Sequence, residues 1–143
     1  MKAITLWQPG ASALFTDSLK PDETFSWPMP AALAGREIAI HAAKRWTIQE
    51  RKTWLWLSTP PVLRQFREIG ITGSNELPRG AIIGIITFAP SIRTQDIRDH
   101  RETDQRAWGD YTAGRWAWPV RTKRLLPAPV PFTGRQGFFD WTP

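Results

Sequence analysis

The sequence predicts an α+β fold in which a small closed or nearly closed β-barrel is flanked by helices. Strand-like segments outnumber helix-like ones, the helix signals lie in the first half of the chain, and glycine or proline stands where strands would bend. Because strands and helices do not alternate along the chain, a doubly wound parallel sheet is disfavoured. We expect about five to six strands and about two to four helices.

The first elements are two strands with a short helix after the first. Residues 2–7 form a short apolar run of strand length, and Pro9 then suits the first turn of a helix. Pro21 places a loop before the segment 22–27, because proline is disfavoured inside a strand. Residues 36–42 alternate between two faces, which predicts the next strand.

Two helices follow this strand. Thr47 and Glu50 have the spacing of a capping box, which predicts a helix start in "TIQERKTWLWLS". The segment 60–70 has prolines at its start and Gly70 at its end, as helices often do.

The second half of the chain reads mainly as strands. Residues 80–90 form a buried strand in which Gly84 indicates a bulge or bend. The segment 115–126 is a further strand, and Pro119 requires it to have an edge or a bulge. Prolines at 127, 129 and 131 predict a stiff extended connection, and 137–141 form the last strand.

Length and composition predict one domain that spans residues 1–143. With 41% hydrophobic residues the chain can bury a core, and it has no apolar run of about 18 residues that would cross a membrane. The N-terminal apolar stretch is too short for a convincing signal peptide, so we expect a cytoplasmic protein. The absence of cysteine excludes disulfides, thiolate nucleophiles and the usual structural zinc sites.

The charge distribution favours an anionic partner. The formal net charge is +6, and no acidic residue lies between Tyr111 and Phe139. The basic residues of that segment are Arg115, Arg121, Lys123, Arg124 and Arg135. Such a one-signed segment indicates a nucleic-acid contact better than scattered charge does.

Six segments, in this order, resemble the ASCH domain family, in its single-domain bacterial or phage type. They are "KAITLWQPGASAL", K-x-x-E-T with "SW" behind it, "IHAAKRW", "RGAIIGIITF", "WGDYTAGRWAW" and "PVPFTGRQGFFDW". The resemblance extends from Lys2 to Trp141. It implies a barrel related to the PUA domain, with a cleft between barrel and helices, and it implies RNA or a modified nucleoside as ligand.

The family motif G-x-K-x-x-E-x-R reads S-x-K-x-x-E-x-F in this chain. Lys20 and Glu23 are in place, whereas Ser18 and Phe25 replace the glycine and the arginine. The missing arginine removes a planar donor fork suited to phosphate or carboxylate. Any role of that arginine would fall to another residue, such as Arg36 or Arg45.

Two enzymatic alternatives follow from the resemblance. Some ASCH-like proteins remove the acetyl group of N4-acetylcytidine with a lysine and a threonine three residues after it. Here Glu23 holds that third position, and Thr24 points to the opposite face of a strand. A metal-independent ribonuclease therefore ranks above this amidohydrolase, with Lys20 and Glu23 as catalytic residues and Lys44 stabilising developing negative charge.

Binding of single-stranded RNA or a modified nucleoside through a basic cleft, without catalysis, is the leading hypothesis. We expect no cofactor and no metal, a monomer, and DNA as the alternative nucleic acid. His41 lies in a strand and is expected to be structural. The residues expected to contact nucleic acid are Trp7, Gln8, Lys20, Trp27, Lys44, Arg45, Arg115, Arg121, Lys123 and Arg135.

The nine tryptophans leave a third interpretation open, a protein-interaction module. About five or six of them are expected in the core. Trp54 and Trp56 cannot both face the same way on a helix, so one of them is expected near the surface. Trp7 and Trp27 adjoin loops of the expected cleft, where an indole could stack on an unpaired base.

Overall fold

The computed structural model describes all 143 residues. The strands are β1 (Lys2–Leu6), β2 (Asp22–Phe25), β3 (Glu37–Ala42), β4 (Ala81–Phe88), β5 (Ile92–Arg93), β6 (Trp116–Pro131) and β7 (Phe138–Asp140). The helices are α1 (Gly10–Ala13), α2 (Ile48–Leu57), α3 (Pro60–Glu68), α4 (Thr94–Ile97) and α5 (Thr103–Arg106), with 3-10 turns at Ala31–Leu33, Ser74–Glu76 and Arg98–His100.

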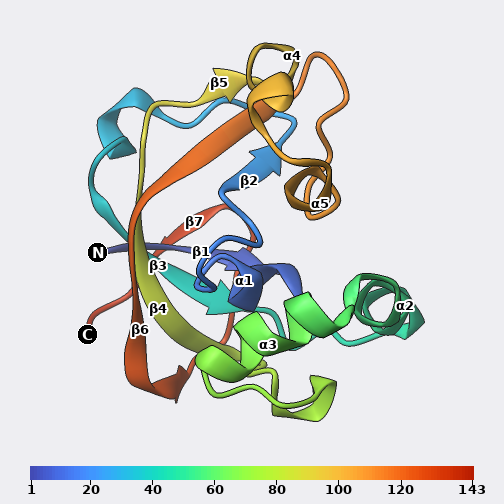
Figure 1. The fold of residues 1–143 in the computed structure, drawn as a ribbon. Coiled ribbons are helices and arrows are strands. Elements are labelled where there is room, and N and C mark those ends of the chain that lie inside the picture. Colours follow the sequence, from blue (N-terminus) through green and yellow to red (C-terminus); the bar gives the residue numbers. More distant parts are fainter.

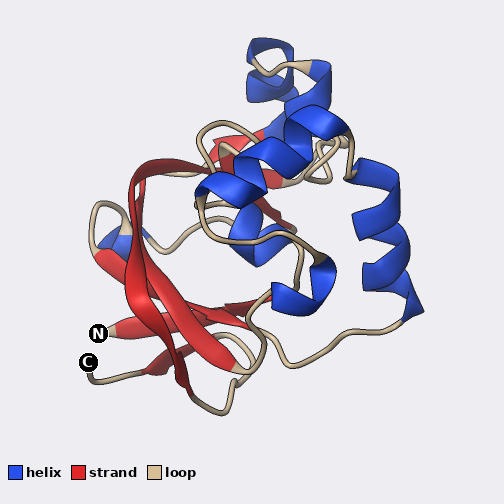
Figure 2. Ribbon diagram, turned by 60° about the horizontal axis from the view of Figure 1, so that its bottom comes forward, coloured by secondary structure: helices blue, strands red, loops and turns tan.

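The seven strands form one curled sheet in the order β2-β6-β4-β3-β1-β7, with β5 paired to β6. Only β1 and β3 run parallel, and every other pair is antiparallel. The long strand β6 pairs with β2 and β5 at its start and with β4 from Val120 onward (Figure 1). The helices gather at one side of the curled sheet (Figure 2). The predicted α+β architecture is confirmed, although β2 and β7 do not pair and the barrel stays open.

The predicted bend at Gly84 is confirmed. The pairing of β4 with β6 shifts register between Ile82 and Gly84. A side chain at position 84 would collide with the Phe15 ring and would lie 2.7 Å from the carbonyl oxygen of Arg124. Glycine therefore lets the Phe15 ring and the β6 backbone approach β4 closely.

The proline-rich connection predicted at 127–131 is instead part of β6. Val130 pairs with Ile82 and Pro131 with Ala81, whereas Gly84 pairs with Leu125. Pro127 and Pro129 fall in the irregular stretch between these pairs, where a missing N–H breaks no ladder hydrogen bond. The prolines thus produce a bulge rather than ending the strand.

We expected the helices in the first half of the chain, but two short helices lie in the second half. α4 and α5 lie at 94–106, between β5 and β6. Each has four residues, about one turn, which is too short to show a helical hydrophobic period. The predicted capping box at α2 is confirmed, since Thr47 and Glu50 bond each other's backbone N–H groups.

The core is centred on Trp118, which is fully buried between the rings of Phe25, Phe88 and Phe138. The buried tryptophans are Trp54, Trp108, Trp118 and Trp141, fewer than expected. Trp54 is buried and Trp56 is 84% exposed, so one of the two tryptophans of α2 lies at the surface, as predicted. No helix is both long and apolar enough to span a membrane.

Candidate nucleic-acid interface

The structure brings Lys20 and Glu23 together as an ion pair. Lys20 precedes β2, Glu23 lies within it, and Nζ and Oε2 are 2.7 Å apart in a largely buried setting. A Cβ atom at Gly10 would lie 2.9 Å from Nζ, so the glycine makes room for the ammonium. At this distance the Coulomb attraction between the two charges is strong. Each charge is thus largely neutralised by the other.

A second buried network stands next to this pair. Asp22 is fully buried and accepts hydrogen bonds from Arg101 Nε at 2.7 Å and Nη2 at 2.9 Å, and from the Tyr111 hydroxyl at 2.6 Å. Burial, together with the bond to Asp22, raises the pKa of Tyr111, which keeps its hydroxyl a donor. The bond to Asp22 likewise raises the pKa of Arg101. This network fixes β2 against the 101–111 segment.

The cleft between barrel and helices consists of two neighbouring pockets that share the lining residues Leu57, Ala107 and Trp108. The inner pocket, of about 190 Å³, adjoins Trp7, Gly10 and Glu50; the outer one, of about 550 Å³, adjoins Trp56, Glu102 and Asp104. Neither pocket is lined by a lysine or an arginine. The cleft therefore lacks the basic lining that we expected of it.

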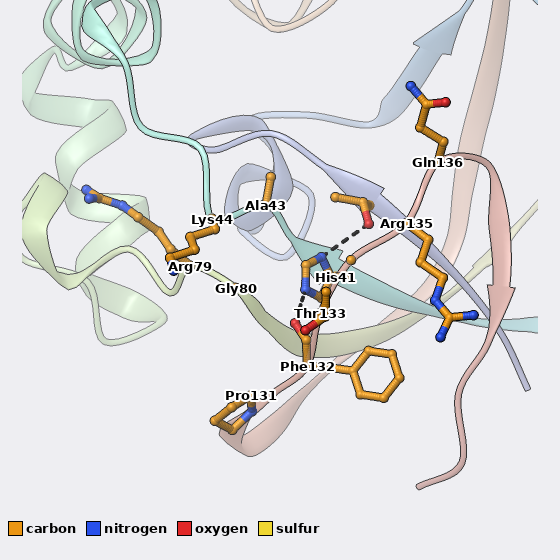
Figure 3. Close-up of a pocket in the computed structure, with 12 residues that line it drawn as sticks. His41, Ala43, Lys44, Arg79, Gly80, Pro131, Phe132, Thr133, Arg135 and Gln136 are labelled. Carbon is orange, nitrogen blue, oxygen red and sulfur yellow. Dashed lines mark hydrogen bonds between the residues drawn. The ribbon is translucent and has the colours of Figure 1, made fainter.

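A basic lining occurs instead in a groove of about 850 Å³ at the ends of β1 and β3. We call this hollow the basic groove. Lys44, Arg79 and Arg135 line it, together with Thr5, His41, Phe132, Thr133, Gly134 and Gln136 among others, and no acidic residue does. Lys44 and Arg79 lie on one side of His41 and Arg135 on the other (Figure 3). Arg79 also stacks on Trp46 at 4.2 Å, and its Nε is buried without a hydrogen-bond partner.

His41 forms the floor of the basic groove. Nδ1 contacts Thr5 Oγ1 at 3.2 Å, and Nε2 contacts the carbonyl oxygen of Phe132 at 2.6 Å (Figure 3). A Cβ at Gly134 would lie 2.6 Å from the imidazole Cε1, so glycine lets the C-terminal loop close over the ring. Both ring nitrogens are occupied, which agrees with a structural role.

Trp7 is 59% exposed and lines the inner pocket, two residues after Thr5 of the basic groove. The Arg45 guanidinium lies 4.2 Å from its ring centroid, and Arg45 Nε donates to Glu50 Oε2 at 3.0 Å. Burial opposes ionisation of Glu50, but hydrogen bonds from Thr47 and Arg45 outweigh it and lower its pKa. Arg45 is thus an ordered cation that holds the indole in place.

Two other residues that we expected to contact nucleic acid make contacts within the protein instead. Gln8 is buried, its Nε2 donates to Ser12 Oγ and to the Pro78 carbonyl, and its Oε1 accepts the Ser12 N–H. Both amide hydrogens are therefore used and cannot read a base. Trp27 is 36% exposed but packs against Trp118 at the rim of the core.

The basic residues of the 111–139 segment do not form one patch. Arg115 contacts Asp110 at 3.4 Å, and Lys123 donates to the carbonyl oxygens of Thr16 and Asp17. Burial lowers the pKa of Lys123. Arg121 lies with Lys20 and Lys123 around a hollow of about 260 Å³, away from the residues that line the basic groove. Of the basic residues in this segment, only Arg135 lines that groove.

The sequence pattern did not single out Arg79, which lies in a loop before β4, nor did it indicate a network of Asp22, Arg101 and Tyr111. Only the fold brings these distant residues together. No three His, Cys, Asp or Glu side chains are placed to hold a metal ion.

Comparisons with known proteins identify the fold. No protein-family model and no curated protein matches the chain. Structures of an ASCH protein from Zymomonas mobilis do match: its crystal structure and that of a tyrosine-to-phenylalanine variant each have a TM-score of 0.53 and 16% identity. A serine-to-alanine variant gives 0.52, also at 16% identity. The alignments cover 99% of this chain and 87–89% of the others. The chain therefore has the α+β fold of these ASCH structures, as its motifs predicted.

Proposed function

We propose that the protein binds single-stranded RNA, with the phosphates in the basic groove and a base on Trp7. The observation that carries this proposal is the lining of the groove, which has three cations and no acid. Phosphate contacts supply most of the affinity of nucleic-acid binding proteins. The choice of RNA over DNA rests on the resemblance to ASCH domains.

The shape of the groove favours an extended polyanion over a compact phosphate. Arg135 is separated from Lys44 and Arg79 by the His41 floor (Figure 3). A backbone with successive phosphates would contact both sides, and the Thr133 hydroxyl and the Gln136 amide lie along the same groove.

Trp7 is close enough to the groove to receive a base from the same strand of RNA. Thr5 lines the groove and Trp7 follows two residues later, at most about 7 Å along an extended chain. A base stacked on an aromatic side chain contributes about 1–3 kcal/mol. Single strands suit this arrangement because their bases are free to stack.

A pair of double variants tests the proposal. Lys44→Ala with Arg135→Ala removes two groove cations, and Lys52→Ala with Arg67→Ala removes two exposed cations of α2 and α3. The net charge falls equally in both. We expect fluorescence anisotropy with a labelled, mixed-sequence single-stranded RNA to show binding about ten- to hundredfold weaker in the groove variant, and a much smaller change in the control. Equal losses would mean that only net charge matters and would refute the groove; tighter binding of DNA would refute the choice of RNA.

A second candidate function is RNA cleavage at Lys20 and Glu23. It is favoured by one observation, the buried ion pair whose Glu23 Oε2 has no further partner. Amide hydrolysis lacks similar support, because the Thr24 hydroxyl accepts the N–H of Asp110 and is fixed there.

The cleavage candidate is tested with EDTA present, so that no metal-dependent contaminant contributes. A catalytic pair predicts that the wild type cleaves the RNA. It also predicts that the Lys20→Met, Glu23→Gln variant binds the RNA without cleaving it. Replacing both residues avoids leaving one buried charge unpaired. Intact RNA with the wild type would exclude cleavage and leave binding alone.

A further inference from the structure

The outer part of the cleft has a different chemistry from the basic groove. It is a hollow of about 550 Å³ between α3, the end of α2 and α5. Its lining includes the indoles of Trp56 and Trp108 and the carboxylates of Glu102 and Asp104, but no lysine or arginine. We call this hollow the outer cleft.

The two carboxylates have no ion-paired cation, although the Glu102 side chain also caps α5 by accepting a backbone N–H of that helix. Neither Glu102 nor Asp104 takes part in an ion pair, although 19 lysines and arginines outnumber 13 acids in the chain. Both are exposed residues of the α5 region at the border of the hollow. Two unpaired acids beside a cavity create a local negative potential in a protein that is otherwise basic.

Trp56 adds an aromatic surface at the same place. It is 84% exposed at the end of α2, whereas Trp54 of the same helix is buried and packs on Phe66. The face of an indole attracts cations, and most strongly those that are weakly hydrated. An exposed indole and two carboxylates without an ion-pair partner around one hollow suit a flat or alkylated cation.

We infer that the outer cleft binds a cationic, N-methylated nucleobase, stacked on Trp56 with its positive charge toward Glu102 and Asp104. The volume lies in the range of small-ligand sites. The choice of a base over a cationic protein side chain rests on the proposed RNA binding. It is also supported by the inner pocket, which shares Leu57, Ala107 and Trp108 with the outer cleft and is itself lined by Trp7.

The path from the groove to the outer cleft follows α2. Glu50 lines the inner pocket and Trp56 the outer one, six residues later, which is about 9 Å along a helix axis. An RNA strand held at the groove could thus place a more distant nucleotide in the outer cleft.

Binding of 7-methylguanosine and guanosine, measured by isothermal titration calorimetry, tests the inference. These nucleosides carry no phosphate and differ in one methyl group and one positive charge. We expect 7-methylguanosine to bind about tenfold or more tightly than guanosine. Trp56→Ala should weaken 7-methylguanosine binding by about the same factor, and Trp56→Phe by less. Leu55→Ala, an exposed position of α2 outside the cleft, should change nothing.

The carboxylates have their own test. Glu102→Gln with Asp104→Asn keeps the shape of the cleft and removes its charge, so we expect the preference for 7-methylguanosine to disappear. Equal binding of the two nucleosides by the wild type would overturn the inference. Tighter binding of a trimethyllysine peptide than of 7-methylguanosine would also overturn it and indicate a protein partner. Fluorescence anisotropy with unmodified RNA on the same preparation separates the two proposals. If the RNA binds but 7-methylguanosine shows no preference, only the inference about the outer cleft fails.

Discussion

An Asp22→Ala variant is expected to lose about 3–5 kcal/mol of unfolding free energy, because it leaves the Arg101 guanidinium without its partner in a partly buried site. Asp22 has no exposed surface, and it accepts both from Arg101 and from Tyr111. For a chain of this size the loss corresponds to a fall in Tm of between about 6 and 20 °C. Thermal unfolding followed by circular dichroism measures it.

The matched control uses another arginine–carboxylate contact. Glu37 and Arg124 pair at 3.1 Å with both side chains more than half exposed, so Glu37→Ala is expected to cost about 0–1 kcal/mol. If Asp22→Ala and Glu37→Ala melted within about 2 °C of each other, the buried network would not hold β2 in place.

A Trp118→Ala variant is expected to lose a similar amount, about 3–5 kcal/mol, through a cavity in the main core. The Trp118 ring is fully buried, lies 4.2 Å from the Phe25 ring centroid, and donates from Nε1 to the Trp27 carbonyl. Truncation removes these contacts and leaves that carbonyl unpaired.

Trp56→Ala provides the comparison at the same residue type. Because Trp56 is 84% exposed, its truncation is expected to change the free energy of unfolding by no more than about 0.5 kcal/mol. Urea denaturation of both variants measures the difference. A Trp118→Ala protein as stable as Trp56→Ala would show that the core is not centred on Trp118.

Local signals predicted much of the fold. The Thr47–Glu50 capping box, the Pro9 start of α1 and the Gly84 bend depend on neighbouring residues, and each appears in the structure. The course of β6 through Pro127 and Pro129 could not be predicted, because it depends on the bulge opposite β4. The one-turn helices α4 and α5 are likewise too short for a periodic signal.

The candidate site was predictable only in part. The spacing of Lys20 and Glu23 indicated a pair, and that pair forms. The location of the basic surface was not predictable, because Lys44, Arg79 and Arg135 come from three distant loops that the β3–β4, β4–β6 and β1–β7 pairings bring together. The acidic character of the outer cleft escaped prediction for the same reason, since Glu102 and Asp104 reach it through α5.

The central claim is that RNA phosphates occupy the basic groove, and the salt dependence of affinity tests it most directly. For single strands, log K falls by about 0.7 per log unit of salt for each phosphate contact. We predict that Lys44→Ala with Arg135→Ala reduces this slope by about 1.4, whereas Lys52→Ala with Arg67→Ala leaves it at the wild-type value. Equal slopes for the wild type and the groove variant would contradict the account, because the RNA would then bind elsewhere.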